Sequence, residues 1–226
     1  MRPEFVNIDF SPHARFARHP KLAKFLYSVG IVSEQRWKAF QSVDSDIICH
    51  DLRRGLPFPD ASFEFVYHSH FLEHLSRENA DKFIAECLRV LRPHGLIRVV
   101  VPDLELLCRK YLRTIDQDAD SHLQSIANIF ELMVRMDTAG TSAQKPVVRY
   151  FERIIRGNAF KTGQLHQWMY DRVSLGRLLS RNGFCEIIRR DAISSDLPSW
   201  EHIGLDTEPD GTELHPGSLF MEARAG

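Results

Sequence analysis

The stretch over residues 46–103 constrains the fold more than any other part of this sequence. Three short apolar runs typical of β-strands lie inside it, at residues 47–50, 63–68 and 96–101. An amphipathic helix is expected between the second and third runs, because Ser76 can cap its start and residues 92–95 bring a cation, a proline and a glycine to its end. Near-continuous apolar strands joined by such a helix are typical of a parallel sheet that is covered on both faces.

Polar side chains stand at the end of each of these strands. Asp51 follows the first run, the sequence His68, Ser69 and His70 closes the second, and Asp103 follows the third. In open parallel sheets, ligands bind outside the carboxyl ends of the strands, where the loops leave the sheet. The sequence therefore predicts a binding site at this edge.

Further elements are expected before and after this stretch. Residues 4–10 alternate into a short strand that closes on Asp9, and residues 13–41 have an amphipathic helical pattern in two pieces. Near the end of the chain we expect a helix at residues 172–181 and strands at 184–189 and 218–223. A helix and two strands that close an α/β chain indicate a terminal antiparallel strand pair.

Residues 104–165 separate two predicted strands by far more chain than a crossover needs. The apolar spacing predicts three helices there, at residues 104–115, 122–136 and 147–156. Asp103 can cap the first helix, and the apolar residues of the second, Leu123 and Phe130 among them, are expected in the core. We interpret residues 104–165 as a helical cap insertion over the strand ends of a single domain that spans residues 1–226.

Composition limits the classes of partner and compartment. The formal net charge is −1 and the pI is near 6.8, so no global positive field favours nucleic acid or an anionic membrane. The four cysteines include no CxxC pair, which is typical of reduced thiols in a cytosolic protein. No run approaches the roughly 18 apolar residues that a membrane span needs. We expect a cytoplasmic protein without a transmembrane segment; the oligomeric state is left open.

Several ordered sequence blocks resemble one known family. The segment LPFPDASFEFVYHSHFLEHL, followed by FIAECLRVLRPHGLIRVVVPD, resembles the class I S-adenosylmethionine-dependent methyltransferases of the methyltransferase-11 type. FVNIDFSP upstream, and NGF and SLFMEA downstream, are similar to the second strand and the closing hairpin of that family. The resemblance implies a Rossmann-like, mostly parallel sheet with helices on both faces and S-adenosyl-L-methionine as the cofactor.

The resemblance also implies positions for the cofactor. Its binding residues would be Asp9, Phe10, Asp51, Leu52, His68 and Ser69. Asp9 would hold the two ribose hydroxyls, since a carboxylate can accept two charge-assisted hydrogen bonds from a cis-diol, each worth about 1.5–3 kcal/mol. Asp51 with Leu52 would face the adenine, while His68 and Ser69 would border the methionine arm and the methyl group.

One family feature is absent from the sequence. The first strand of the family ends in a glycine-rich GxGxG loop, and no such loop occurs here. That strand normally lies between the second and the fourth, so its absence should leave a gap in the ladder of strands. Two alternatives follow: the functional protein starts upstream of Met1, or the chain is a divergent member with weakened or absent cofactor binding.

The expected activity is methyl transfer to a hydroxyl or amine of a small-molecule or glycan-type acceptor, with no nucleic-acid partner. A general base is needed only for a protonated, poorly nucleophilic acceptor, and His70 and then His166 are the candidates. The HxHxxxH spacing of His68, His70 and His74 also invites a metal interpretation, but we predict no metal site. The alternative function is a catalytically inactive, methyltransferase-like binding or scaffold protein.

Overall fold

The computed structural model describes residues 5–10, 19–30, 32, 34, 37–38, 47–116, 119–133 and 166–226. The chain divides into two compact units. The first comprises Met1–Arg54 and Asp137–Thr162, and the second comprises Gly55–Met136 and Gly163–Gly226. Among the described residues, no helix combines the length and the apolar character required to cross a membrane.

The first unit contains a pair of parallel strands. β1 (Ile8–Asp9) pairs with β2 (Ile48–Cys49), with Asp9 opposite Cys49 in the register. β1 is shorter than the strand predicted for residues 4–10. Helix α2 (Pro20–Ser28) begins with a proline at its first position, where the missing N–H costs no hydrogen bond. Most of the second predicted helical piece lies outside the described residues.

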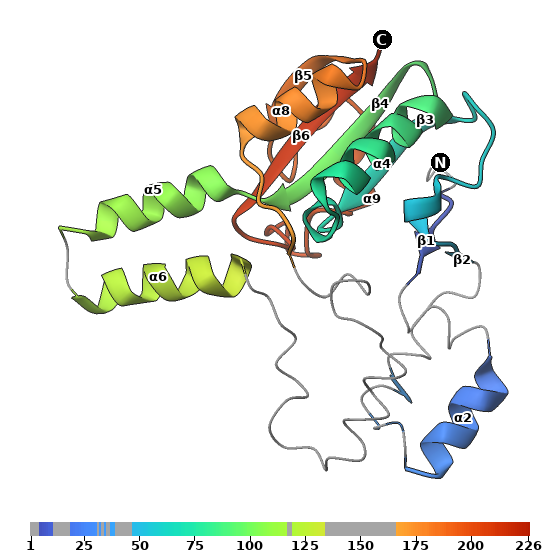
Figure 1. Cartoon of the computed structure of the whole chain (residues 1–226), viewed down its shortest axis with the longest axis horizontal. Coiled ribbons are helices and arrows are strands. Elements are labelled where there is room, and N and C mark those ends of the chain that lie inside the picture. The colour runs from blue at the N-terminus through green and yellow to red at the C-terminus, as the bar shows by residue number, and fades with distance from the viewer. Residues whose placement is uncertain are drawn as a thin grey trace. The chain divides into compact units, whose positions relative to one another are not determined.

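The second unit is built on a four-stranded sheet with the order β3-β4-β6-β5 (Figure 1). Its strands are β3 (Phe63–Ser69), β4 (Leu91–Pro102), β5 (Phe184–Arg190) and β6 (Ser218–Ala225). β3 and β4 are parallel, and β6 runs antiparallel to both of its neighbours. The terminal antiparallel pair is therefore confirmed. In the described part of the chain the strands fall into two sheets, one in each unit, and the expected gap in the ladder stays a prediction.

Strand β4 begins five residues earlier than its apolar run. Helix α4 (Arg77–Val90) ends before the predicted stop at residues 92–95, and Leu91 already has extended geometry and pairs with Phe63. The register then shifts, so that Leu96 pairs with Phe65 and the residues between form a bulge. A Cβ atom on Gly95 would lie 2.8 Å from the Arg92 carbonyl oxygen, so this bulge requires glycine.

Helices cover both faces of the sheet in the second unit. On one face, α4 begins at Ser76, whose Oγ accepts a hydrogen bond from the Asn79 N–H, and it buries Phe83, Ile84 and Cys87. Helix α8 (Arg172–Arg181) packs beside α4 on that face, against β5 and β6. On the other face, Trp200 of the short helix α9 (Trp200–Ile203) contacts the rings of Phe65 and Tyr67.

A buried arginine fixes the last loop of the chain to the sheet. Arg98 of β4 is 0% exposed and donates hydrogen bonds to Asp206 Oδ2 at 2.7 Å and to Glu222 Oε1 at 2.9 Å. It also donates to the carbonyl oxygens of Ser194 and Asp191. Because the guanidinium uses its fork of donors on four acceptors, the segment that returns to β6 is tied to the centre of the sheet.

Two of the three predicted cap helices lie within the described residues. α5 (Leu104–Thr114) is capped by Asp103, as expected, and α6 (Ala119–Met133) begins three residues before its predicted start. The prediction that Leu123 and Phe130 are buried is wrong, because they are 62% and 64% exposed. α6 turns its polar side toward α5, where Ser125 Oγ lies 2.9 Å from Thr114 Oγ1. The predicted helix at 147–156 lies outside the described residues, and the cap as an insertion stays a prediction.

Candidate functional site

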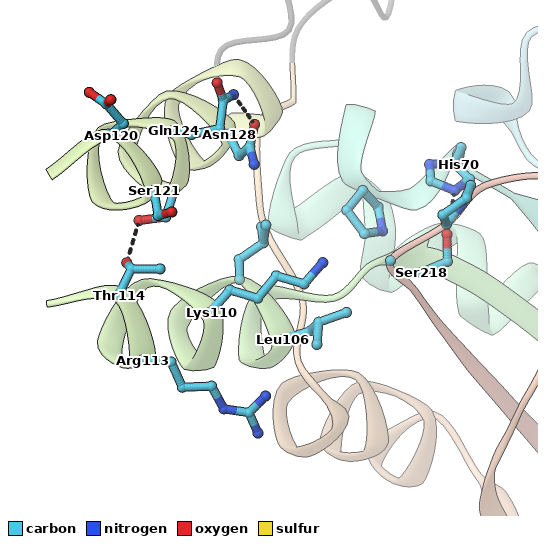
Figure 2. A pocket seen from close by; sticks show the side chains of 15 residues that line it. His70, Leu106, Lys110, Arg113, Thr114, Asp120, Ser121, Gln124, Asn128 and Ser218 are labelled. Atoms are coloured by element: carbon cyan, nitrogen blue, oxygen red, sulfur yellow. Dashed lines mark hydrogen bonds between the residues drawn. The ribbon is translucent and has the colours of Figure 1, made fainter. Parts of the chain in front are cut away.

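A pocket of about 760 Å³ opens at the carboxyl ends of β3 and β4, inside the second unit. His70 and Ser218 lie at one end of it, and polar side chains of α6 lie at the other, with α5 forming the wall between them (Figure 2). The α6 residues are Asp120, Ser121, Gln124, Ser125 and Asn128. Lys110 and Arg113 of α5 add two cationic groups. The edge of the sheet that the sequence predicts as a binding site is therefore hollow, with polar residues at both ends of the pocket.

His70 has an unusual backbone conformation at the end of β3. Its φ is +47°, in the left-handed region, and its N–H donates to the carbonyl oxygen of Val100 at 2.9 Å. This geometry directs the ring toward the pocket, where Nε2 lies 3.0 Å from Ser218 Oγ. Backbone strain of this kind persists only where the surrounding structure holds it in place, and it clusters at functional sites.

Glu73 is the site residue that the sequence interpretation missed. It belongs to the 3₁₀ helix η2 (Leu72–His74), is 0% exposed, and has Oε1 3.2 Å from His70 Nδ1 and 3.9 Å from His166 Nε2. Within the described residues neither carboxylate oxygen accepts a well-aligned hydrogen bond, although these rings stand close to it. The available signal was the acid inside the apolar run FLEHL. If this run is buried, its glutamate is buried with it, and a buried acid is uncommon enough to mark a candidate site.

His166 is held beside Glu73 rather than at the pocket. The segment that follows it is bound to η2, because the N–H of Gln167 donates to the Glu73 carbonyl oxygen at 2.7 Å. The His166 side chain is 2% exposed and is not among the residues that line the pocket. Of the two histidines predicted as catalytic, only His70 reaches the pocket in this structure; their catalytic roles stay predictions.

His68 and Ser69 are the last two residues of β3 and directly precede His70. The His68 ring packs edge-on against Phe83 of α4, with centroids 5.2 Å apart, and neither ring nitrogen has a hydrogen-bond partner in the described part of the chain. Burial lowers the pKa of His68 to about 4, and the charge of Glu73 offsets only part of that effect. A cofactor contact of His68 or Ser69 stays a prediction.

The buried, neutral His68 gives a testable pH dependence. The folded-state pKa is about 4, below the unfolded value of about 6.5, so folding opposes protonation of this ring. Its contribution to stability is present above about pH 6.5 and is lost as the pH falls toward 4. Urea unfolding should therefore show that His68→Phe loses less stability than the wild type between about pH 7 and pH 5. An identical pH dependence in the two proteins would contradict this account; exposed His202→Phe is the control.

The remaining predicted cofactor residues lie in the first unit. Asp9 ends β1, and Asp51 follows β2 by two residues, so the parallel register brings both acids to the same edge of this strand pair. Phe10 follows Asp9, and Leu52 begins the 3₁₀ helix η1 (Leu52–Arg54). The Asp51 carbonyl oxygen accepts a hydrogen bond from the Arg54 N–H at 2.9 Å, which turns the chain away from the edge.

The three histidines of the HxHxxxH spacing, His68, His70 and His74, do not form a common ligand cluster within the described residues.

Asp103, the other strand-end acid, is 1% exposed and accepts the Leu106 N–H at 3.1 Å and an Arg189 N–H at 3.1 Å. It caps α5, and this use of its carboxylate explains its position without a catalytic role.

Comparison with known proteins finds a similarity in the first part of the chain. Residues 5–99 match the model of a family described as "Methyltransferase domain". A curated protein of Mycolicibacterium smegmatis, described as a probable S-adenosylmethionine-dependent methyltransferase, is 42% identical over 57 residues. This match covers 24% of the present chain and spans only 21% of the length of that relative.

Among solved structures, the chain is similar to the PH0226 protein of Pyrococcus horikoshii, with 14% identity, a TM-score of 0.45, and coverage of 100% of this chain and 84% of that one. A SAM-dependent methyltransferase of Archaeoglobus fulgidus has 14% identity, a TM-score of 0.43 and coverage of 97% and 84%. Human N-acetylserotonin methyltransferase, solved in complex with SAM, has 13% identity, a TM-score of 0.40 and coverage of 84% and 37%. Residues 5–99 are thus similar to the class I S-adenosylmethionine-dependent methyltransferases, whose methyl donor is S-adenosyl-L-methionine.

Proposed function

We propose that this chain transfers a methyl group from S-adenosylmethionine to a hydroxyl or amine of a small-molecule or glycan-type acceptor. The observation that carries the acceptor class is the pocket of about 760 Å³, a size that suits a small molecule. Hydroxyl and amide side chains line its far end. They can donate hydrogen bonds to the hydroxyl groups of a methyl acceptor and accept hydrogen bonds from them.

Methyl transfer from S-adenosylmethionine requires no covalent intermediate on the protein. The sulfonium of the donor is already activated, so the main task is to align nucleophile, methyl carbon and sulfur, which can lower the barrier by about 7–11 kcal/mol. His70 is the proposed contact to the acceptor, because it lines the pocket beside Ser218. The burial of His166 supports His70 over His166 in this role.

We assign the proposed cofactor contacts to the ribose, the adenine and the methionine arm as the family resemblance implies. Asp9 and Phe10 would serve the ribose, Asp51 and Leu52 the adenine, and His68 and Ser69 the methionine arm. The shared edge of Asp9 and Asp51 supports the first two assignments. A cytoplasmic location is part of the proposal and is supported by four cysteines that are all free. The net charge of −1 supports an acceptor other than nucleic acid.

Methyl transfer can be tested before the acceptor is identified. The full chain, incubated with methyl-labelled S-adenosylmethionine and pools of sugars, phenols and amines, should release S-adenosylhomocysteine only when a suitable acceptor is present. Asn128→Trp should lower this release at least about tenfold, because the indole occupies part of the pocket and displaces the acceptor from its aligned position.

Leu123→Trp is the matched control, since Leu123 is on the same helix, is 62% exposed, and does not line the pocket. Equal losses in both variants would remove the pocket from the acceptor site. Cofactor binding without any acceptor-dependent release, across pools that serve known methyltransferases, would favour the alternative of an inactive binding or scaffold protein.

A further inference from the structure

Three side chains from two distant segments gather close to His70, which lines the pocket. Glu73 and His74 come from η2, and His166 comes from the segment that leads toward α8. Each offers one ligand atom, a carboxylate oxygen or an imidazole nitrogen, and these three atoms all lie within 4.8 Å of one another. The set differs from the HxHxxxH pattern that the sequence suggests, because only His74 belongs to both.

The burial of Glu73 calls for a counter-charge. Its carboxylate is 0% exposed, and neither oxygen accepts a well-aligned hydrogen bond within the described residues. Buried charges in proteins are paired, hydrogen-bonded or bound to metal ions. Two imidazoles lie close to this carboxylate, with His70 Nδ1 at 3.2 Å and His166 Nε2 at 3.9 Å from Oε1.

The two segments are fixed to each other by their own hydrogen bonds. The N–H groups of Gln167 and Trp168 both donate to the Glu73 carbonyl oxygen, at 2.7 and 3.2 Å. The Gln167 side chain donates to the His74 carbonyl oxygen at 2.7 Å. The rings of His74 and His166 meet edge-on with centroids 4.7 Å apart. This scaffold positions the three candidate ligands before any ion arrives, as a built metal site requires.

We propose that Glu73, His74 and His166 bind a divalent transition-metal ion of the zinc type. Two imidazoles and one carboxylate are a ligand set that zinc accepts, and the fourth position is left to water. Bonds of about 2.0–2.2 Å place neighbouring ligand atoms about 3.4 Å apart, so binding draws the three side chains closer together. His70 lies between this cluster and the pocket, so the ion would stand behind the acceptor site.

Metal binding can be measured without knowledge of the acceptor. The full chain, purified without an affinity tag and stripped with a chelator, should bind one Zn²⁺ per molecule in calorimetry. Co²⁺ should give the visible absorption bands of a tetrahedral site with mixed nitrogen and oxygen ligands. His166→Ala and Glu73→Gln should each weaken Zn²⁺ binding at least about tenfold, and Zn²⁺ should raise the melting temperature of the wild type but not of these two variants.

Exposed His202→Ala is the control for binding to surface histidines and should behave like the wild type. If His166→Ala does not fold, His74→Gln and the Co²⁺ spectrum of the wild type still decide the question. Absence of a stoichiometric Zn²⁺ site in the wild type, or unchanged affinity in folded Glu73→Gln and His74→Gln, would overturn the proposal. The proposed methyl transfer is tested by a different experiment, and it would be contradicted by absence of S-adenosylhomocysteine binding or release whether or not Zn²⁺ binds.

Discussion

Arg98→Met should destabilise the protein by about 3–5 kcal/mol, the cost of removing one partner from a buried ion pair. The side chains of Asp206 and Glu222 are each only 2% exposed, and both lose the guanidinium that neutralises them. Tyr67 still donates to Asp206 at 2.6 Å, and Arg190 still pairs with Glu222 at 3.1 Å. The variant therefore keeps partial compensation, and its stability should fall without the fold being abolished.

Urea unfolding of Arg98→Met beside Arg92→Met tests this expectation. Arg92 is on the same strand and pairs with Glu64, but the two side chains are 53% and 81% exposed. Exposed pairs contribute about 0–1 kcal/mol, so Arg92→Met should be nearly neutral. Arg98→Lys, which keeps a charge but loses the planar fork, should fall between them. Equal effects of the Arg98→Met and Arg92→Met substitutions would contradict the role assigned to the buried network.

Asp9→Ala should weaken the binding of S-adenosylhomocysteine at least about tenfold. A carboxylate that accepts two hydrogen bonds from the ribose hydroxyls contributes about 1.5–3 kcal/mol through each, and about 1.4 kcal/mol corresponds to a factor of ten. Asp60→Ala is the control, since that acid is 79% exposed and has no proposed contact with the cofactor. An unchanged dissociation constant in Asp9→Ala would remove Asp9 from the cofactor site.

Local patterns predicted the elements of the fold well. Ser76 and Asp103 cap the helices that the sequence indicates, and the strand at residues 63–68 appears as Phe63–Ser69. Residues 92–95 were less predictable, because the same proline and glycine that stop a helix also permit the bulge through which β4 pairs with β3. Spacing alone does not distinguish these two uses.

Contacts between distant segments were beyond local patterns. The partners of Arg98 lie about a hundred residues away, and the run IRVVV signals a strand without revealing what neutralises the charge inside it. The position of Glu73 between His70 and His166 likewise depends on a segment that joins η2 only through tertiary hydrogen bonds. The family resemblance supplied strand-end residues, whereas the pocket and the buried carboxylate came from the structure.

Calorimetric titration of the full chain with S-adenosylhomocysteine tests most directly whether this chain binds the cofactor of the proposed methyl transfer. The account predicts saturable binding of one molecule, weakened in Asp9→Ala and unchanged in Asp60→Ala. Absence of heat up to about 1 mM ligand, the weak end of ordinary enzyme affinities, would contradict it.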